Sequence, residues 1–149
     1  MIELLEVRPD DLSGDLASAV HRLLRDAFPK VGPNEGDYYC KLGPPEVAIV
    51  LRDGPQVFGH LGLYTREVEI GNETLEIGML RAIVVAPDRR RRGYGRLLVR
   101  RAHEHLKERR KLMQSAMHFT WPDGIPMYAE LSQRRWPPTR AEALTIGSS

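Results

Sequence analysis

One continuous stretch of the sequence decides how this chain folds: Ile83-Val84-Val85-Ala86-Pro87-Asp88-Arg89-Arg90-Arg91-Arg92-Gly93-Tyr94-Gly95-Arg96-Leu97-Leu98. An apolar strand ends at Pro87, and a short basic turn with two glycines then opens directly into a helix. The glycines let the free N–H groups of the first helical turn approach an anion closely, while the helix dipole and the arginines add positive charge. The stretch therefore predicts a cradle for a pyrophosphate that requires no metal ion.

The remaining sequence predicts an α+β fold in a single domain of residues 1–149. Periodicity and turn signals indicate strands over residues 2–7, 46–52, 56–69, 73–85, 115–121 and 141–146, and helices over residues 13–27, 93–113 and 124–135. The three strands from residue 46 to residue 85 are divided by turn signals at 53–55 and 71–72, which is typical of an antiparallel meander. Residues 29–45 are rich in glycine and proline, so we expect a long loop there, of the kind that often binds a ligand.

Composition and charge exclude several classes of protein. Of the 149 residues, 42% are hydrophobic and 28% are charged, which excludes a disordered tail and a collagen-like repeat. The single cysteine, Cys40, cannot form an internal disulfide, and no apolar run approaches the roughly 20 residues of a membrane span. The chain shows no secretory pattern at its N-terminus, so we expect a cytoplasmic protein. The net charge is only +2, but 11 basic residues against 3 acidic ones between Ala86 and Lys111 predict a multiply charged anionic ligand.

The basic turn matches a known cofactor motif. It is neither a P-loop nor a Rossmann turn, because the spacings of those phosphate-binding motifs are absent. Its pattern Val85-x-Pro87-x-x-Arg90-x-x-Gly93-x-Gly95 resembles the acetyl-CoA motif of the Gcn5-related N-acetyltransferase (GNAT) superfamily. The resemblance implies a mixed, mostly antiparallel central sheet flanked by helices. It also implies transfer of an acetyl group from acetyl-CoA to a primary amine of a small polar acceptor by direct attack.

The same resemblance implies which residues bind the cofactor. The main-chain groups of Ile83, Val84 and Val85 are expected to run along the pantetheine arm, which carries amides and can pair like an extra strand. The pyrophosphate is expected to lie on the turn and the start of the helix, at Arg90, Arg91, Arg92, Gly93, Tyr94, Gly95 and Arg96. No metal is expected to take part.

Tyr128 is the candidate general acid. In the superfamily a tyrosine early in the helix after the fifth strand often protonates the leaving CoA thiolate, and a phenol with a pKa near 10 is well matched to that task. A general base is harder to assign, because the family position for it falls near Arg81, and an arginine cannot accept a proton. Glu76 and His118 both remain candidates, as does direct loss of the proton to water.

Weaker similarities point to the acceptor. Residues 68–98 and the segment Pro137-Pro138-Thr139-Arg140 are similar to parts of aminoglycoside 2′-N-acetyltransferases and nodulation N-acyltransferases. This similarity implies an amino sugar or another polar amine, whose ammonium group Glu35 and Asp37 of the long loop would attract. The C-terminal part is shorter than the family pattern, so a partner subunit in a homodimer is one way to complete the site.

Two other readings of the sequence stay open. A non-catalytic CoA-binding or regulatory domain would share the cradle but lack turnover. A basic nucleic-acid-binding module would use the arginine clusters, although no aromatic stacking platform or recognition helix supports it. We therefore expect neither nucleic acid nor a membrane as a partner. The sequence leaves the acceptor, the acyl-chain preference, the general base and the oligomeric state open.

Overall fold

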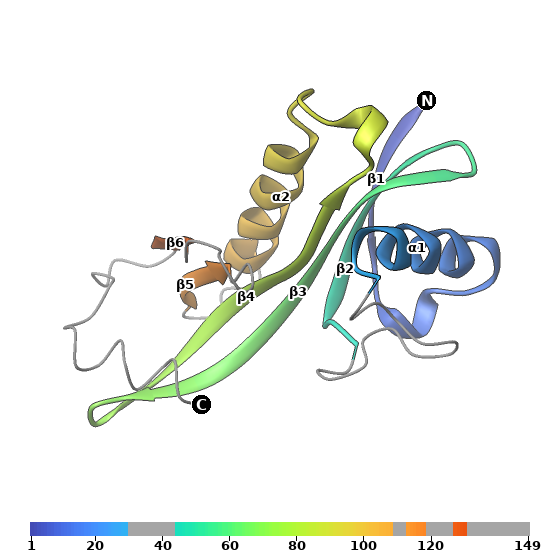
Figure 1. Cartoon of the computed structure of the whole chain (residues 1–149). Helices are drawn as coiled ribbons and strands as arrows, with labels where there is room; N and C mark the ends of the chain where they lie inside the picture. The colour runs from blue at the N-terminus through green and yellow to red at the C-terminus, as the bar shows by residue number, and fades with distance from the viewer. Residues whose placement is uncertain (30–43, 109–112, 119–126, 131–149) are drawn as a thin grey trace. The chain divides into compact units, whose positions relative to one another are not determined.

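The computed structural model describes residues 1–29, 44–108, 113–118 and 127–130 (Figure 1). The elements in chain order are β1 (Ile2–Val7), η1 (Pro9–Asp11), α1 (Gly14–Ala27), β2 (Val47–Asp53), β3 (Gln56–Ile70), β4 (Glu73–Val85), η2 (Pro87–Arg89), α2 (Tyr94–Glu108), β5 (Met113–His118) and β6 (Met127–Glu130). The six strands are hydrogen-bonded neighbours in the order β1-β2-β3-β4-β5-β6. The β4–β5 pair is parallel, whereas β1–β2, β2–β3 and β5–β6 are antiparallel. This arrangement confirms the predicted α+β class with a mostly antiparallel sheet.

The chain divides into two compact units. One consists of Met1–Leu63 with Arg81–Arg101, and the other of Tyr64–Leu80 with Ala102–Ser149. The strands β3 and β4 and the helix α2 each continue from one unit into the other.

The core of the first unit lies between α1 and β2. Val20, Leu23 and Leu24 recur at the spacing that places them on one face of the helix. They are buried in one cluster with Ala48 and Val50, which share a face of β2. Removing each such side chain from water is worth roughly 1.5–3 kcal/mol, so this contact is the main support of the first unit.

Strand β2 is covered on both faces. Residues 47–51 are all buried, although successive side chains of a strand point to opposite faces. Its register pairs Leu4 of β1 with Leu51, and Ile49 with Leu61 of β3. A strand that is paired on both edges and buried on both faces explains why its sequence is a continuous apolar run rather than an alternating one.

In the second unit α2 lies close against β4. A Cβ atom at Gly78 would lie 2.5 Å from Cδ1 of Leu106, so only glycine allows this approach. The helix connects β4 to the parallel strand β5, whose register pairs Gly78 with Ala116 and Leu80 with His118. Parallel neighbours require such a crossover connection.

Most of the predicted elements are confirmed, and one is wrong. The sequence predicted a helix over residues 124–135, but Met127–Glu130 form β6, which pairs Tyr128 with Met117 of β5. Pairing gives this segment interstrand hydrogen bonds with a neighbouring edge, and such tertiary context overrides a weak local helix preference. The helix predicted over residues 93–113 is also too long. In the structure α2 ends at Glu108, and Met113 already belongs to β5. The loop over residues 30–43 and the strand over residues 141–146 lie outside the described residues.

Candidate active site

The basic turn that follows β4 is fixed to the sheet by its backbone. The N–H of Ala86 donates to the carbonyl oxygen of Phe58 on β3 at 2.7 Å, and the N–H of Arg89 donates to Ala86 at 2.9 Å. The guanidinium Nε of Arg90 donates to the carbonyl oxygen of Val85 at 2.9 Å. Arg90 therefore caps the end of β4 with part of its guanidinium while its side chain stays exposed.

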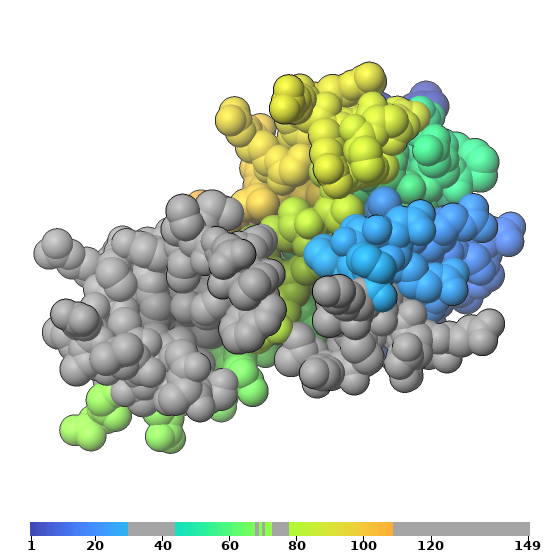
Figure 2. Space-filling view, in the orientation of Figure 1, coloured from blue at the N-terminus to red at the C-terminus, as the bar shows by residue number. Residues whose placement is uncertain are grey.

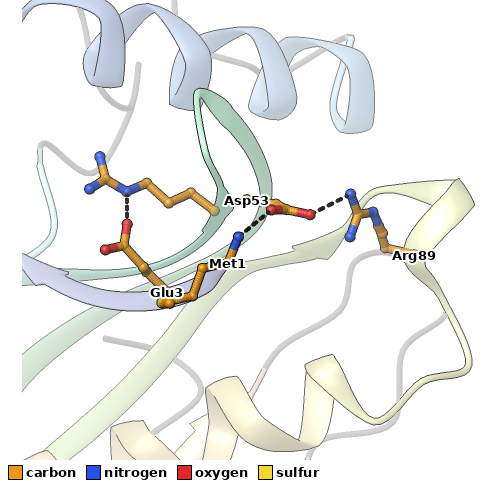
Figure 3. Close-up of polar contacts among 5 residues, drawn as sticks. Met1, Glu3, Asp53 and Arg89 are labelled. Carbon is orange, nitrogen blue, oxygen red and sulfur yellow. Dashed lines mark hydrogen bonds and ion pairs between the residues drawn. The ribbon is translucent and has the colours of Figure 1, made fainter.

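Arg89 fastens the same turn to the end of β2 (Figure 3). Its guanidinium lies 3.1 Å from a carboxylate oxygen of Asp53, and it stacks 4.9 Å from the centroid of the Phe58 ring. The other oxygen of Asp53 accepts a hydrogen bond at 3.2 Å from the terminal ammonium of Met1. That bond and the one from Arg89 hold the pKa of Asp53 below its ordinary value. Arg89 thus has its charge paired within the fold, whereas among the described residues no ion pair is found for Arg90, Arg91 or Arg92.

The N-terminus of α2 presents backbone N–H groups that have no acceptor within the helix. Arg91 and Gly93 both have left-handed backbone, with φ values of 61° and 85°. Gly93 accepts the first helical hydrogen bond, from Leu97 at 3.0 Å, so the N–H groups of the three residues in between have no acceptor within the helix. The side chains of Arg92 and Arg96 are exposed beside these groups, and the space-filling view shows this turn at the surface (Figure 2).

Gly95 is not explained by the packing of the described chain. Its backbone is not left-handed, and within the described residues a Cβ atom there would meet no heavy atom within 4 Å. Glycine in a helix is less favourable than alanine by up to about 1 kcal/mol. Within the described part of the chain the space over Gly95 is therefore open, and it lies beside the N–H groups of the first helical turn.

The ring of Tyr94 packs within the turn. It lies edge-on against Phe58, with the centroids 4.9 Å apart and the planes at 68°. The side chain is half-buried. This packing involves only the side chain, so the binding of a pyrophosphate by the backbone amide of Tyr94 stays a prediction.

The side chains at the end of β4 differ in burial. Val84 is buried in the core cluster with α1, whereas Ile83 and Val85 are half-buried. The side chain of Val84 is therefore committed to the core. That the main chain of residues 83–85 binds the pantetheine arm stays a prediction.

A strained residue and a buried histidine next to this segment were missed by the sequence analysis. Ala82 has a φ of 51°, a conformation that non-glycine residues adopt rarely and at a cost of about 1–3 kcal/mol. Nδ1 of His60 on β3 lies 3.0 Å from the carbonyl oxygen of Ala82. His60 is fully buried, and this burial lowers its pKa to about 4. The ring is therefore neutral near pH 7, and because a carbonyl only accepts, Nδ1 carries the proton and donates. The one signal in the sequence was a histidine inside the apolar run of residues 57–63.

Arg81 stands where the resemblance placed the general base. Its Nε is buried and has no hydrogen-bond partner among the described residues. A guanidinium remains protonated in proteins, so this residue cannot accept a proton from an amine. It is instead a donor beside the strained segment of β4.

The other predicted residues lie in the second unit or outside the description. Tyr128 is on β6, and the two candidate bases are on β4 (Glu76, paired with Met113) and on β5 (His118, paired with Leu80). Glu35 and Asp37 lie outside the described residues.

The described part of the chain shows neither a cluster of metal ligands nor a membrane-spanning helix. Residues 1–29, 44–108, 113–118 and 127–130 contain no group of three or more side chains suited to a metal ion. Over the same residues, neither α-helix is long and apolar enough to cross a membrane.

Comparison with known proteins identifies the family. The family described as acetyltransferase (GNAT) domain matches residues 9–131. The chain therefore belongs to the GNAT acetyltransferases, a family whose typical co-substrate is acetyl-CoA. A comparison with curated proteins found no match.

Solved structures share the fold at low sequence identity. A GNAT family acetyltransferase from Brucella melitensis, in complex with acetyl-CoA, is 17% identical over 91% of each chain, with a TM-score of 0.62. An aminoglycoside acetyltransferase from an uncultured soil metagenomic sample, in complex with trehalose, is 15% identical over 80% of this chain and 77% of its own, with a TM-score of 0.62. The latter is also known in complex with sisomicin. A GCN5-related N-acetyltransferase from Ralstonia eutropha is 20% identical over 80% of this chain and 84% of its own, with a TM-score of 0.54.

Proposed function

We propose that this chain is a single-domain N-acetyltransferase that carries the acetyl group of acetyl-CoA to a primary amine of a small polar acceptor. The observation that carries the proposal is the start of α2, where Gly95 leaves open space over helical N–H groups that have no intrahelical acceptor. A pyrophosphate matches this site because its oxygens accept several N–H bonds at once. Arg91, Arg92 and Arg96 are exposed, and their guanidinium groups would add positive charge for the pyrophosphate.

The pantetheine arm would follow residues 83–85. Its amides would pair with the main chain there as an added strand, which is a general way for an extended ligand to bind a sheet. This placement brings the thioester toward the strained Ala82 and away from the charged turn. It is supported by the core position of the Val84 side chain, which leaves the backbone as the recognition element.

The reaction would proceed by direct attack. The nitrogen of a neutral amine forms a bond to the thioester carbon, and the carbonyl oxygen becomes an oxyanion held by a main-chain N–H of residues 83–85. The carbon–sulfur bond then breaks, and the Tyr128 hydroxyl gives its proton to the departing CoA sulfur. The amine loses its extra proton to Glu76, to His118 or to water. No step requires a metal ion.

An amino sugar is the acceptor class that we favour. The proposal rests on the similarity of residues 68–98 to aminoglycoside 2′-N-acetyltransferases and is supported by the shared fold of the soil aminoglycoside acetyltransferase. Glu35 and Asp37 would attract the ammonium groups of such an acceptor. A second copy of the chain in a homodimer would contribute to the acceptor site.

Calorimetry and thiol release test the proposal. Acetyl-CoA should bind with measurable heat, and free thiol should appear when amino sugars are added as acceptors. The double variant Arg92→Glu with Gly93→Asp should abolish binding, because it places two negative charges at the anion site. Arg100→Glu makes the same arginine-to-glutamate change at an exposed position further along α2 and should leave binding intact.

The outcomes separate the competing readings. Absence of heat with any acyl-CoA would refute the cradle. Binding without turnover on every amine tested would favour the non-catalytic CoA-binding domain. Salt-sensitive binding of duplex DNA, with no binding of acetyl-CoA, would favour the nucleic-acid module.

A further inference from the structure

The strained Ala82 conformation has a specific hydrogen-bonding partner. A residue with a φ of 51° in the middle of a strand turns its peptide group out of the regular pattern of the sheet. Such a conformation persists only where the surroundings hold it. The contact that holds this one is the 3.0 Å hydrogen bond from Nδ1 of His60 to the Ala82 carbonyl oxygen.

This hydrogen bond also fixes the direction of a donor. The carbonyl of Ala82 and the N–H of Ile83 belong to one planar trans peptide unit, in which the two groups point in opposite directions. A carbonyl directed at His60 therefore directs the N–H of Ile83 away from His60. Because His60 is fully buried on β3, its ring cannot be displaced by solvent, and the direction of this N–H is fixed before any ligand binds.

The ring of His60 is neutral and donates from Nδ1. The desolvation of the buried ring disfavours its cation, so Nδ1 carries a single proton that is committed to the Ala82 carbonyl. A side chain that is neutral and fully buried is unsuited to exchanging protons with a substrate. Its contribution is geometric.

We propose that His60 is a positioning residue for acetyl transfer, which through the Ala82 carbonyl aims the N–H of Ile83 at the thioester oxygen of acetyl-CoA. This inference rests on the proposed placement of the cofactor along residues 83–85. The N–H of Ile83 would bind the carbonyl oxygen in the ground state and more tightly the oxyanion that forms when the amine attacks. His60 itself touches neither the cofactor nor the reacting atoms.

Three variants separate the hydrogen bond from the packing of the ring. His60→Phe keeps the ring and removes the donor, whereas His60→Asn removes most of the ring and keeps an N–H donor at the position of Nδ1. In His60→Phe combined with Ala82→Gly, glycine adopts the left-handed conformation without help. Leu61→Val, a change at a fully buried neighbour on the same strand, controls for loss of packing alone.

The readouts are the melting temperature, the Kd for acetyl-CoA and the kcat at saturating acetyl-CoA, all measured below the melting transition. For His60→Phe we expect kcat to fall by about 10- to 100-fold with little change in Kd, because a misdirected donor affects mainly the oxyanion. His60→Asn should recover most of the lost kcat even though its melting temperature is lower. The Ala82→Gly change should restore part of the activity of His60→Phe, and Leu61→Val should keep the parent kcat.

Two results would overturn the inference. One is a kcat for His60→Phe that equals that of the parent. The other is a kcat that follows the melting temperature across all the variants, with His60→Asn as impaired as His60→Phe. Failure of the proposed function looks different, because then the parent protein itself neither binds acetyl-CoA nor releases thiol with any amine.

Discussion

Leu106 occupies the space that a side chain at Gly78 would need, with its Cδ1 2.5 Å from the ideal Cβ position. Leu106 is fully buried on α2, and Gly78 is buried on β4. The glycine therefore sets how closely the helix approaches the strand. A single added methyl group forces the Leu106 side chain, or one of the two elements, to shift.

Gly78→Ala should consequently destabilise the protein. We expect the free energy of unfolding to fall by about 1–3 kcal/mol, the usual effect of an added methyl group in a packed core. Urea denaturation monitored by circular dichroism measures it. The matched control is Gly95→Ala, which adds the same methyl group in open space. Equal stability of Gly78→Ala and the parent would contradict the close approach.

Gly95→Ala should raise stability and weaken cofactor binding. Alanine is a better helix former by up to about 1 kcal/mol, so the free energy of unfolding should stay level or increase. The methyl group projects into the space that we assign to the pyrophosphate, so the Kd for acetyl-CoA should rise by about tenfold or more, equivalent to about 1.4 kcal/mol. Denaturation and calorimetry on the same preparation measure both effects. Unchanged affinity would remove the main support for the cradle.

The bonds of Asp53 with the terminal ammonium of Met1 and with Arg89 should make stability depend on pH in the acid range. The pKa of Asp53 is lowered in the folded protein, so the unfolded chain binds the proton more tightly. The resulting stabilisation is present above the ordinary carboxyl pKa of 3.8 and is lost as the pH falls through the lower folded value. Asp53→Asn should therefore melt earlier than the parent near neutral pH, and the gap should narrow in strong acid. A gap that is constant across the acid range would contradict this linkage.

Burial of His60 should make stability rise with pH over a different range. Its pKa is about 4 in the folded protein against 6.5 ordinarily, so the unfolded chain binds more protons between these values. Stability should increase with pH from about 4 to about 6.5, by about 3 kcal/mol in the limit set by this shift. His21 and His103 add to the same trend, because burial lowers the pKa of each. Urea denaturation across this range measures how steeply the free energy of unfolding rises with pH. This slope should be smaller for His60→Asn than for the parent. The control variant His103→Gln should retain most of the parent's slope.

Tyr128→Phe should slow the chemistry without affecting the cofactor. Loss of a general acid typically reduces turnover by about 10²-fold or more. The Kd for acetyl-CoA should be unchanged, because we assign the binding of the cofactor to β4 and α2. Thiol release at saturating substrates and calorimetry test the two parts separately. A fully active Tyr128→Phe protein would show that the thiolate is protonated by another group.

Much of the fold could be predicted from local patterns. The apolar spacing of α1, the continuous apolar run of β2 and the turn glycines at positions 54 and 71 correctly located the elements from residue 2 to residue 108, because each pattern reflects burial of its own segment. The prediction failed at residues 127–130, where the partner strand β5 decides the conformation. Pairing along an edge is a non-local interaction, and a short segment carries little sign of it.

The sequence by itself determined the chemistry of the anion site, since a strand end, a basic turn and two glycines at the start of a helix lie next to one another in the chain. Only the tertiary structure decided which arginine of the turn is paired inside the protein. Arg89 forms an ion pair with Asp53 of β2 and stacks on Phe58 of β3. The tertiary structure also brought His60 to Ala82, across 22 residues of sequence. Residues that are adjacent in the chain are placed relative to one another by local backbone geometry, which the sequence indicates directly. A hydrogen bond between two strands depends on their register, which only the folded sheet sets.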